Sequence, residues 1–424
     1  MIWTLVGVII AFALIVVLIR RKVNFGVSLC IGALVVGVFS LETIQLIDIP
    51  KAFIEASIYS FKDQQIVTDT IELAVLTTLI YMLAKALQET GSIKKLIDSL
   101  RTMFSKGGTL GFIPAVYGLM PSLPGGAILS APMVDEEGDI FKLDADQKNF
   151  INIWFRHIWE PMYPVSAAMI LICSLQFSNI NIYLLMFLNI PACIAAIIIG
   201  FIFLKKCMKK APVRKKEPHK NYQGFIFLLP AIAPLFFYAV LQFFNFPQTR
   251  SFLIGIIFSI VLLFFLTKLG VKEYVQILKK SFTWKLFIAI FGIMIFREMF
   301  EVTGANVMIA TLFGSLAAPA LVMIIVLPLF LGLLTGYNLG AIALSYFLVE
   351  PFFAATGLPI LGLTSVVFIS ALVGYLVSPI HLCNVLSSDY LHTDTTRIYK
   401  WFIPSALCML AVQVIVVLVV FGVH

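Results

Sequence analysis

The feature that most constrains this chain is a succession of apolar stretches, each about twenty residues long, which is the length that spans the hydrocarbon core of a bilayer. Of the 424 residues, 61% are hydrophobic and only 12% are charged. A soluble domain carries about a quarter charged residues and buries its apolar faces intermittently. The sequence therefore predicts an all-α, polytopic membrane protein for which the lipid bilayer is the solvent.

The order of the apolar stretches predicts ten membrane helices, five in each half of the chain. They are expected at 2–19, 23–40, 68–90, 149–175 and 181–204, then at 224–244, 251–268, 284–304, 363–386 and 400–423. Two further apolar stretches, 108–134 and 320–349, are interrupted by Pro and Gly, and each is predicted to form a re-entrant hairpin. The helices at 149–175 and 363–386 contain central prolines and are predicted to be broken. A basic linker, 205–222, separates the half 1–204 from the half 223–424.

The distribution of Lys and Arg predicts the orientation, because short cytoplasmic loops hold the excess of these residues. With the N-terminus outside, most basic clusters, including the linker 205–222, fall on the cytoplasmic side. Both termini are then outside. The basic residues that give the chain its net charge of +8 lie just beyond the apolar spans, where they set the topology. No nucleic-acid partner is expected. The six cysteines lie mostly in apolar spans without a C-x-x-C pair, so they are expected to fill space.

The two halves also resemble each other in sequence. GLMPSLPGGAI at 118–128 matches GLLTGYNLGAI at 332–342 at five identical positions, and Pro161 aligns with Pro379 at an offset of 218. Because five helices is an odd number, the second copy must enter the membrane upside down. The sequence thus predicts two inverted repeats of five helices and one hairpin each. The alternative is that both hairpins are ordinary, tightly packed helix pairs.

The helix breaks are the predicted binding site, because backbone groups freed inside hydrocarbon must be satisfied by protein, water or a ligand. Helix N-termini that meet near the midplane favour an anion, and freed carbonyl oxygens suit Na⁺. The predicted tip residues are Ser122, Gly125 and Gly126 in the first hairpin and Thr335 and Asn338 in the second. A candidate Na⁺ site lies near Ser122, Thr335, Asn338 and Asn384. No other cofactor is expected.

The stretch WFRHIWEPMYP places Arg156, His157 and Glu160 inside a membrane span, where ionisable residues are rare. One interpretation is a structural ion pair between Arg156 and Glu160, one helical turn apart. The other is that Arg156 binds an oxyanion bidentately while Glu160 accepts a proton. His157 is a second, weaker candidate for proton coupling. Lys85 with Glu89, like Arg297 with Glu301, is assigned a structural role near helix ends.

A polar strip surrounds Pro379 in the second half. Ser378, His381, Asn384 and Ser388 would share one helix face if the helix continued past the proline. Such a strip either holds helices together or lines a cavity, and its position at the repeat-matched break favours the cavity.

The motifs PSLPGGAILSAPMVDEEG and NFINIWFRHIWEPMYP resemble an uncharacterised family of prokaryotic integral membrane proteins. Nearly the whole chain also resembles the ion-transporter superfamily of citrate, dicarboxylate, gluconate and arsenite permeases. The resemblance implies an elevator-type transporter in the cytoplasmic (inner) membrane of a prokaryote, with a scaffold, a moving domain and a homodimeric assembly. The contiguous Ser-Asn-Thr motifs of the carboxylate carriers are missing from both tips.

We therefore expect a secondary active transporter of a small, carboxylate-like organic anion, coupled to H⁺ or Na⁺. Arg156 would anchor the substrate, and Glu160 would act as the proton switch. One alternative is a cation/proton antiporter on the same fold, in which Glu160 carries the exchanged charge. A remote alternative is an intramembrane metal-dependent enzyme built on His157 and Glu160. No soluble-enzyme signature is present, and the sequence shows no second cluster that would complete such a metal site.

Overall fold

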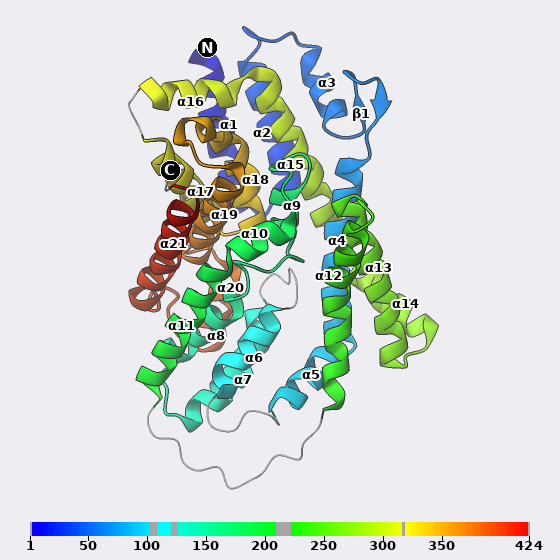
Figure 1. The fold of residues 1–424 in the computed structure, drawn as a ribbon, viewed down its shortest axis with the longest axis vertical. Helices are drawn as coiled ribbons and strands as arrows, with labels where there is room; N and C mark the ends of the chain where they lie inside the picture. The colour runs from blue at the N-terminus through cyan, green and yellow to red at the C-terminus, as the bar shows by residue number, and fades with distance from the viewer. Residues whose placement is uncertain (1, 102–107, 120–125, 209–221, 316–318, 423–424) are drawn as a thin grey trace.

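A computed structural model describes residues 2–101, 108–119, 126–208, 222–315 and 319–422 of the chain. The described residues are almost entirely helical (Figure 1). The exception is a short antiparallel ladder in which β1 (Tyr59–Ser60) pairs with β2 (Gln65–Ile66), and Tyr59 lies opposite Ile66. The prediction of an all-α chain is confirmed apart from this two-residue ladder.

Seven described helices are long and apolar enough to cross a membrane, which makes the chain a multi-pass membrane protein. In four of them, among them the first and the last, only 28% of the most apolar window is buried inside the protein. The remaining apolar side chains face outward, where only lipid makes them favourable. The seven helices span residues 2–20, 69–89, 190–207, 223–242, 248–267, 338–356 and 399–421.

Most predicted helices lie within a few residues of their expected positions. They are α1 (Ile2–Arg20), α2 (Phe25–Phe39), α4 (Asp69–Glu89), α13 (Gln248–Thr267), α15 (Trp284–Thr303) and α21 (Tyr399–Phe421). Two others are subdivided, into α10 (Ile182–Leu188) with α11 (Ile190–Cys207) and into the 3-10 helix η1 (Gln223–Leu228) with α12 (Leu229–Gln242). Local chemistry explains several boundaries. The Asn24 side chain, for example, accepts the backbone N–H of Gly26 and so fixes the start of α2.

Short helices that the apolar pattern did not predict connect the long ones. They are α3 (Asp48–Glu55), α5 (Ser92–Arg101), α14 (Val271–Ser281) and α16 (Ala305–Ser315). The first three carry charged residues on one face and apolar residues on the other. Such helices suit a membrane surface better than its core, and a search for continuous apolar runs does not detect them.

The two predicted hairpins are each a pair of helices. The first consists of α6 (Gly108–Gly118) and α7 (Ala127–Ile140), so its second arm extends six residues beyond the expected end at 134. The second consists of α17 (Ala320–Thr335) and α18 (Asn338–Val349), followed by the 3-10 helix η2 (Glu350–Thr356). The acidic residues 135–139 are part of α7. There Asp135 and Asp139 each accept a hydrogen bond of 2.6 Å from Lys148.

Both helices that were predicted to be broken at a central proline are interrupted. Residues 149–175 form α8 (Ala145–His157) and α9 (Ala167–Cys173), and residues 363–386 form α19 (Ile360–Leu376) and α20 (Leu382–Tyr390). Proline lacks an N–H and clashes with the preceding turn, which explains why neither helix continues.

The helices pack in two neighbouring groups. On one side α12 packs against α13, α13 against α4, α4 against α15, and α15 against α2. On the other side α17 packs against α19, α19 against α21, α21 against α11, and α11 against α8. Figure 1 shows α4, α12 and α13 standing apart from α21, α19 and α11, with α15 and α2 nearer the middle. The broken helices and the hairpins belong to the second group.

Candidate functional site at the two helix breaks

The first break follows His157 and extends to Ser166, where α9 begins. Its freed carbonyl groups find partners in the neighbouring helices. The Asn189 side chain donates to the Pro161 carbonyl at 2.8 Å, and the Cys193 thiol donates to the Ile158 carbonyl at 3.1 Å. Asn189 is fully buried and also accepts the Ser365 hydroxyl at 2.6 Å. The backbone at this break is therefore held by side chains that the sequence analysis did not single out.

The second break separates α19 from α20 at Ser378, Pro379 and His381. The Ser378 hydroxyl donates to the Leu333 carbonyl of α17 at 2.7 Å, which ties the break to the second hairpin. Because five residues between the two helices are not helical, the condition for a continuous polar face is not met. Ser378 and His381 lie in the turn, whereas Asn384 and Ser388 lie on α20.

The two hairpin ends meet the breaks through glycines. A Cβ added at Gly126 would stand only 2.7 Å from Cζ of Arg156, so the guanidinium lies against the start of α7. At the second hairpin, Gly336 has a left-handed φ of 58°, and a Cβ there would stand 2.7 Å from an Ile380 side-chain carbon. Glycine is needed at Gly336 both for the turn and for the close approach. Ser122 and Gly125, the other predicted tip residues, lie outside the described residues.

The predicted Na⁺ ligands do not form one group of available oxygens. The Thr335 hydroxyl donates to the Leu331 carbonyl at 2.8 Å. The Asn384 side-chain oxygen accepts from Asn149 and from Ser388, each at 3.2 Å. Asn338, by contrast, has a buried side-chain oxygen that no described residue hydrogen-bonds. Of these three side-chain oxygens, that of Asn338 is the one with no hydrogen bond to a described residue.

The described residues bring the two breaks together in one buried cluster of ionisable side chains. The rings of His157 and His381 are 4.9 Å apart, and the Tyr375 ring lies 4.4 Å from that of His381. The Glu160 carboxylate is 4.0 Å from Nε2 of His157. Since α8 ends at His157, Glu160 lies in the turn beyond the helix and is not one helical turn from Arg156. The cluster thus joins a histidine of each half.

A second polar group, centred on Asn149 and Asn152 of α8, was missed by the sequence analysis. Asn149 donates to Ser388 at 2.9 Å, and Asn152 donates to Ser387 at 2.8 Å and to the Ala127 carbonyl at 3.0 Å. Both asparagines are fully buried. Two amides three residues apart inside an apolar span place both on one helix face, and this spacing was the available signal.

The pairs assigned a structural role form ion pairs within their own helices. Lys85 lies 3.1 Å from Glu89, and Arg297 lies 2.5 Å from Glu301. In both pairs the residues are four apart, and each side chain is more than a fifth exposed. Exposed pairs of this spacing contribute little to stability, about 0.3–0.5 kcal/mol.

The chain matches a known family model over nearly its whole length. The model of the family described as "Protein of unknown function (DUF401)" matches residues 4–423. The chain belongs to this family. A comparison with curated proteins finds no match.

In this member of the DUF401 family, some of the buried polar atoms that no described residue hydrogen-bonds lie at the breaks and at the second hairpin, and others lie on α1, α19 and α21. Glu160, Tyr163, Asn338 and His381 each have a buried side-chain polar atom that no described residue hydrogen-bonds. Leaving such a group dry and unpaired costs about 1–3 kcal/mol. Four of them in these segments indicate a site that is completed by water, an ion or a substrate.

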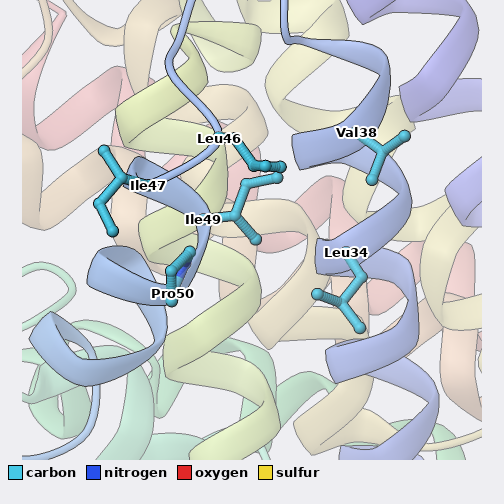
Figure 2. A pocket seen from close by; sticks show the side chains of 6 residues that line it. All are labelled: Leu34, Val38, Leu46, Ile47, Ile49 and Pro50. Carbon is cyan, nitrogen blue, oxygen red and sulfur yellow. The ribbon is translucent and has the colours of Figure 1, made fainter.

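An apolar groove elsewhere on this DUF401 chain has a different character. Figure 2 shows its lining, which comes from the end of α2 and from the start of α3 and the residues just before it. All six lining side chains are apolar: Leu34, Val38, Leu46, Ile47, Ile49 and Pro50. No lining side chain can bind a polar ligand or take part in proton transfer, so the breaks remain the candidate site.

Proposed function

We propose that the protein is a secondary active transporter of a small, carboxylate-like organic anion, driven by a gradient of H⁺ or Na⁺. The observation that carries the proposal is that Glu160, Tyr163, Asn338 and His381, at the two breaks and the second hairpin, each have a buried polar atom that no described residue hydrogen-bonds. A rigid structural core would satisfy such atoms internally. A binding site leaves them for the substrate and for water.

Similar packing in the two halves supports an inverted repeat, which is the design of many transporters of this kind. A Cβ at Gly118 would collide with the backbone of Arg156, and one at Gly332 would lie 2.6 Å from the backbone nitrogen of Tyr375. At the offset of 218 that relates Pro161 to Pro379, Arg156 corresponds to Gly374, the residue before Tyr375. Matching glycines of the two hairpins therefore press on matching points of the two broken helices.

The pairing of the hairpins with the breaks also has a twofold pattern. The first arms pack within their own halves, α6 against α8 and α17 against α19. The second arms pack against broken helices of both halves, α7 against α8 and α20, and α18 against α19 and α9. A site built in this way receives residues from both halves, as alternating access requires.

The preference for an anion rests on Arg156. Its side chain is buried, and its guanidinium lies against Gly126, at the N-terminal end of α7. A helix N-terminus carries partial positive charge, and a guanidinium binds carboxylates bidentately. Both groups attract negative charge to the same place. Since Gly374 occupies the matching position in the second half, the anchoring charge belongs to the first half alone.

The proposal includes the wider arrangement implied by the sequence. It places the chain in the ion-transporter superfamily, as a homodimer in the cytoplasmic membrane of a prokaryote with both termini outside. The second helix group, which contains the hairpins and broken helices, would be the moving domain. The group formed by α4, α12, α13, α15 and α2 would be the scaffold. Crosslinking between single cysteines on the two groups, measured with and without a driving gradient, tests this division.

Thermal stabilisation of the purified protein tests the substrate class. Acetate, succinate and citrate would be compared with Na⁺ and with chloride at equal ionic strength. The proposal expects at least one carboxylate to raise the melting temperature. Stabilisation by Na⁺ with no effect of any carboxylate would instead favour the cation/proton antiporter.

Substitution of Arg156 tests the anchor. A lost charge-assisted hydrogen bond costs about 1.5–3 kcal/mol, so Arg156→Ala should weaken carboxylate binding about 10- to 150-fold and reduce uptake into proteoliposomes. Arg156→Lys should lose less, because the charge remains. Arg297→Ala is the matched control, since Arg297 pairs with Glu301 in its own helix. Full uptake by Arg156→Ala with unchanged expression would return Arg156 to a structural role.

A further inference from the structure

The buried cluster between the two breaks contains a group of metal-binding side chains, and the transport proposal assigns no metal to it. His157 ends α8, His381 precedes α20, and Cys383 lies in the first turn of α20. One ligand atom from each of the three lies within 4.8 Å of the other two. All three side chains are at least 95% buried. The sequence conceals this group, because His157 is more than 220 positions from the other two.

The orientation of both imidazoles suits a metal ligand. Nδ1 of His157 lies 2.6 Å from the Ile153 carbonyl, and Nδ1 of His381 lies 3.4 Å from the Leu376 carbonyl. A carbonyl can only accept, so each Nδ1 carries the proton and each Nε2 presents a lone pair. A histidine that ligates a metal typically donates its other ring N–H to a carbonyl in this way. Nε2 of His381 has no hydrogen-bond partner among the described residues.

The separations are close to those of a tetrahedral zinc site. Zinc binds histidine nitrogen at about 2.0–2.1 Å and cysteine sulfur at about 2.3 Å, so its ligand atoms stand roughly 3.3–3.6 Å apart. The three ligand atoms here lie within 4.8 Å of one another, and closure by roughly 1 Å would complete the geometry. Glu160, whose carboxylate is 4.0 Å from Nε2 of His157, is positioned to become a fourth ligand. The Tyr375 hydroxyl, at 3.3 Å from the same nitrogen, would give up a long hydrogen bond.

We propose that His157, His381 and Cys383 form a binding site for Zn²⁺ that joins the broken helix of one half to that of the other. Imidazole and thiolate ligands select zinc over Na⁺, Mg²⁺ and Ca²⁺, which prefer oxygen. The Cys383 thiolate and the Glu160 carboxylate would balance the charge of the ion. The site goes beyond anion transport, and it stands whether or not Arg156 binds a substrate.

The first test is the spectrum of the purified full-length protein with Co²⁺, which reports zinc sites. Binding through Cys383 predicts a sulfur-to-cobalt charge-transfer band in the near ultraviolet, intense tetrahedral bands in the visible, and about one ion per chain. Excess Zn²⁺ should abolish the bands. Absence of the charge-transfer band in the unsubstituted protein would overturn the proposal, and this readout does not depend on whether any variant folds.

The second test compares variants after metal has been removed with a chelator. Loss of an outer-shell partner alone weakens metal sites 10- to 100-fold, so Cys383→Ser and His381→Gln should each weaken Zn²⁺ binding at least about 100-fold. Both should lose the zinc-induced rise in melting temperature. Cys173→Ser, a buried cysteine of α9, and His392→Asn, an exposed histidine, are the matched controls and should bind normally. Unchanged affinity in a folded Cys383→Ser variant would refute the site.

Discussion

Asn152 offers the sharpest test of how the first hairpin is attached to the broken helices. This fully buried side chain of α8 makes three hydrogen bonds. It accepts the Ser130 hydroxyl of α7 at 2.6 Å and donates to the Ala127 carbonyl at 3.0 Å and to the Ser387 hydroxyl of α20 at 2.8 Å. Asn152→Ala removes all three bonds. The three helices then lose a side chain that hydrogen-bonds to both α7 and α20.

The size of the effect follows from which partners keep another bond. Ser130 also lies 3.2 Å from the Ala127 carbonyl, so these two groups continue to satisfy each other. Ser387 is left without the bond that Asn152 supplied. Three hydrogen bonds inside a membrane protein are worth about 0.6 kcal/mol each, and one orphaned buried hydroxyl adds about 1–3 kcal/mol. We expect Asn152→Ala to lower the free energy of unfolding by about 3–5 kcal/mol.

Equilibrium unfolding in mixed detergent and SDS micelles, followed by tryptophan fluorescence, measures this change. Asn306→Ala is the matched control, because the Asn306 side chain accepts only the adjacent backbone N–H of Val307. The control should change stability by less than about 0.5 kcal/mol. A double-mutant cycle with Ser387→Ala should show coupling of at least about 0.5 kcal/mol. A loss for Asn152→Ala no larger than the control, or an additive cycle, would show that the reasoning is wrong.

Three other substitutions have definite expected outcomes in the same unfolding assay. Gly374→Ala should lower the free energy of unfolding by about 1–3 kcal/mol, because the added Cβ would collide with a backbone carbonyl of α17. Gly314→Ala is the control, because Gly314 lies in open space on α16, and it should be neutral or slightly stabilising. Arg250→Ala should cost at most about 1 kcal/mol and less at high salt, because its bonds of 2.9–3.0 Å to Glu72 are partly exposed. Lys148→Met should lower the free energy of unfolding more than Arg250→Ala does. The Lys148 side chain is only 8% exposed, and its loss leaves two aspartates of α7 without their cation.

The sequence located the helix breaks because proline acts locally. Pro161 and Pro379 each lie in an interruption, because the missing N–H and the steric clash belong to the residue itself. Proline alone does not decide the break, since Pro114, Pro234 and Pro328 lie inside continuous helices. The apolar runs located the long helices for a similar reason, since a span needs about twenty apolar residues in one stretch. The prediction of a multi-pass membrane protein is thus confirmed by helix length and hydropathy.

The contacts that depend on tertiary packing could not be predicted from the sequence. Cys383 resembled a space-filling cysteine because nothing near it in sequence indicates that His157 lies beside it. Nothing in the sequence around Asn189 indicates that its amide donates a hydrogen bond to the carbonyl of Pro161. The shared face of the polar strip around Pro379 depended on a helix that continued past the proline, and residues 377–381 are not helical. Transport, the inverted repeat and the orientation of the termini stay predictions.

The glycine contacts between hairpin and broken helix limit how the domain can deform. At Gly118 and Gly332 the backbone of a hairpin arm rests directly on the backbone of a broken helix, with no side chain between them. No side chains lie between the two backbones, so none can change rotamer or repack to let one backbone slide along the other. Each arm is therefore in direct backbone contact with its broken helix, so a displacement of one must also displace the other. Flexibility that opens a path for a substrate has to come from the far ends of the arms or from the boundary with the other helix group.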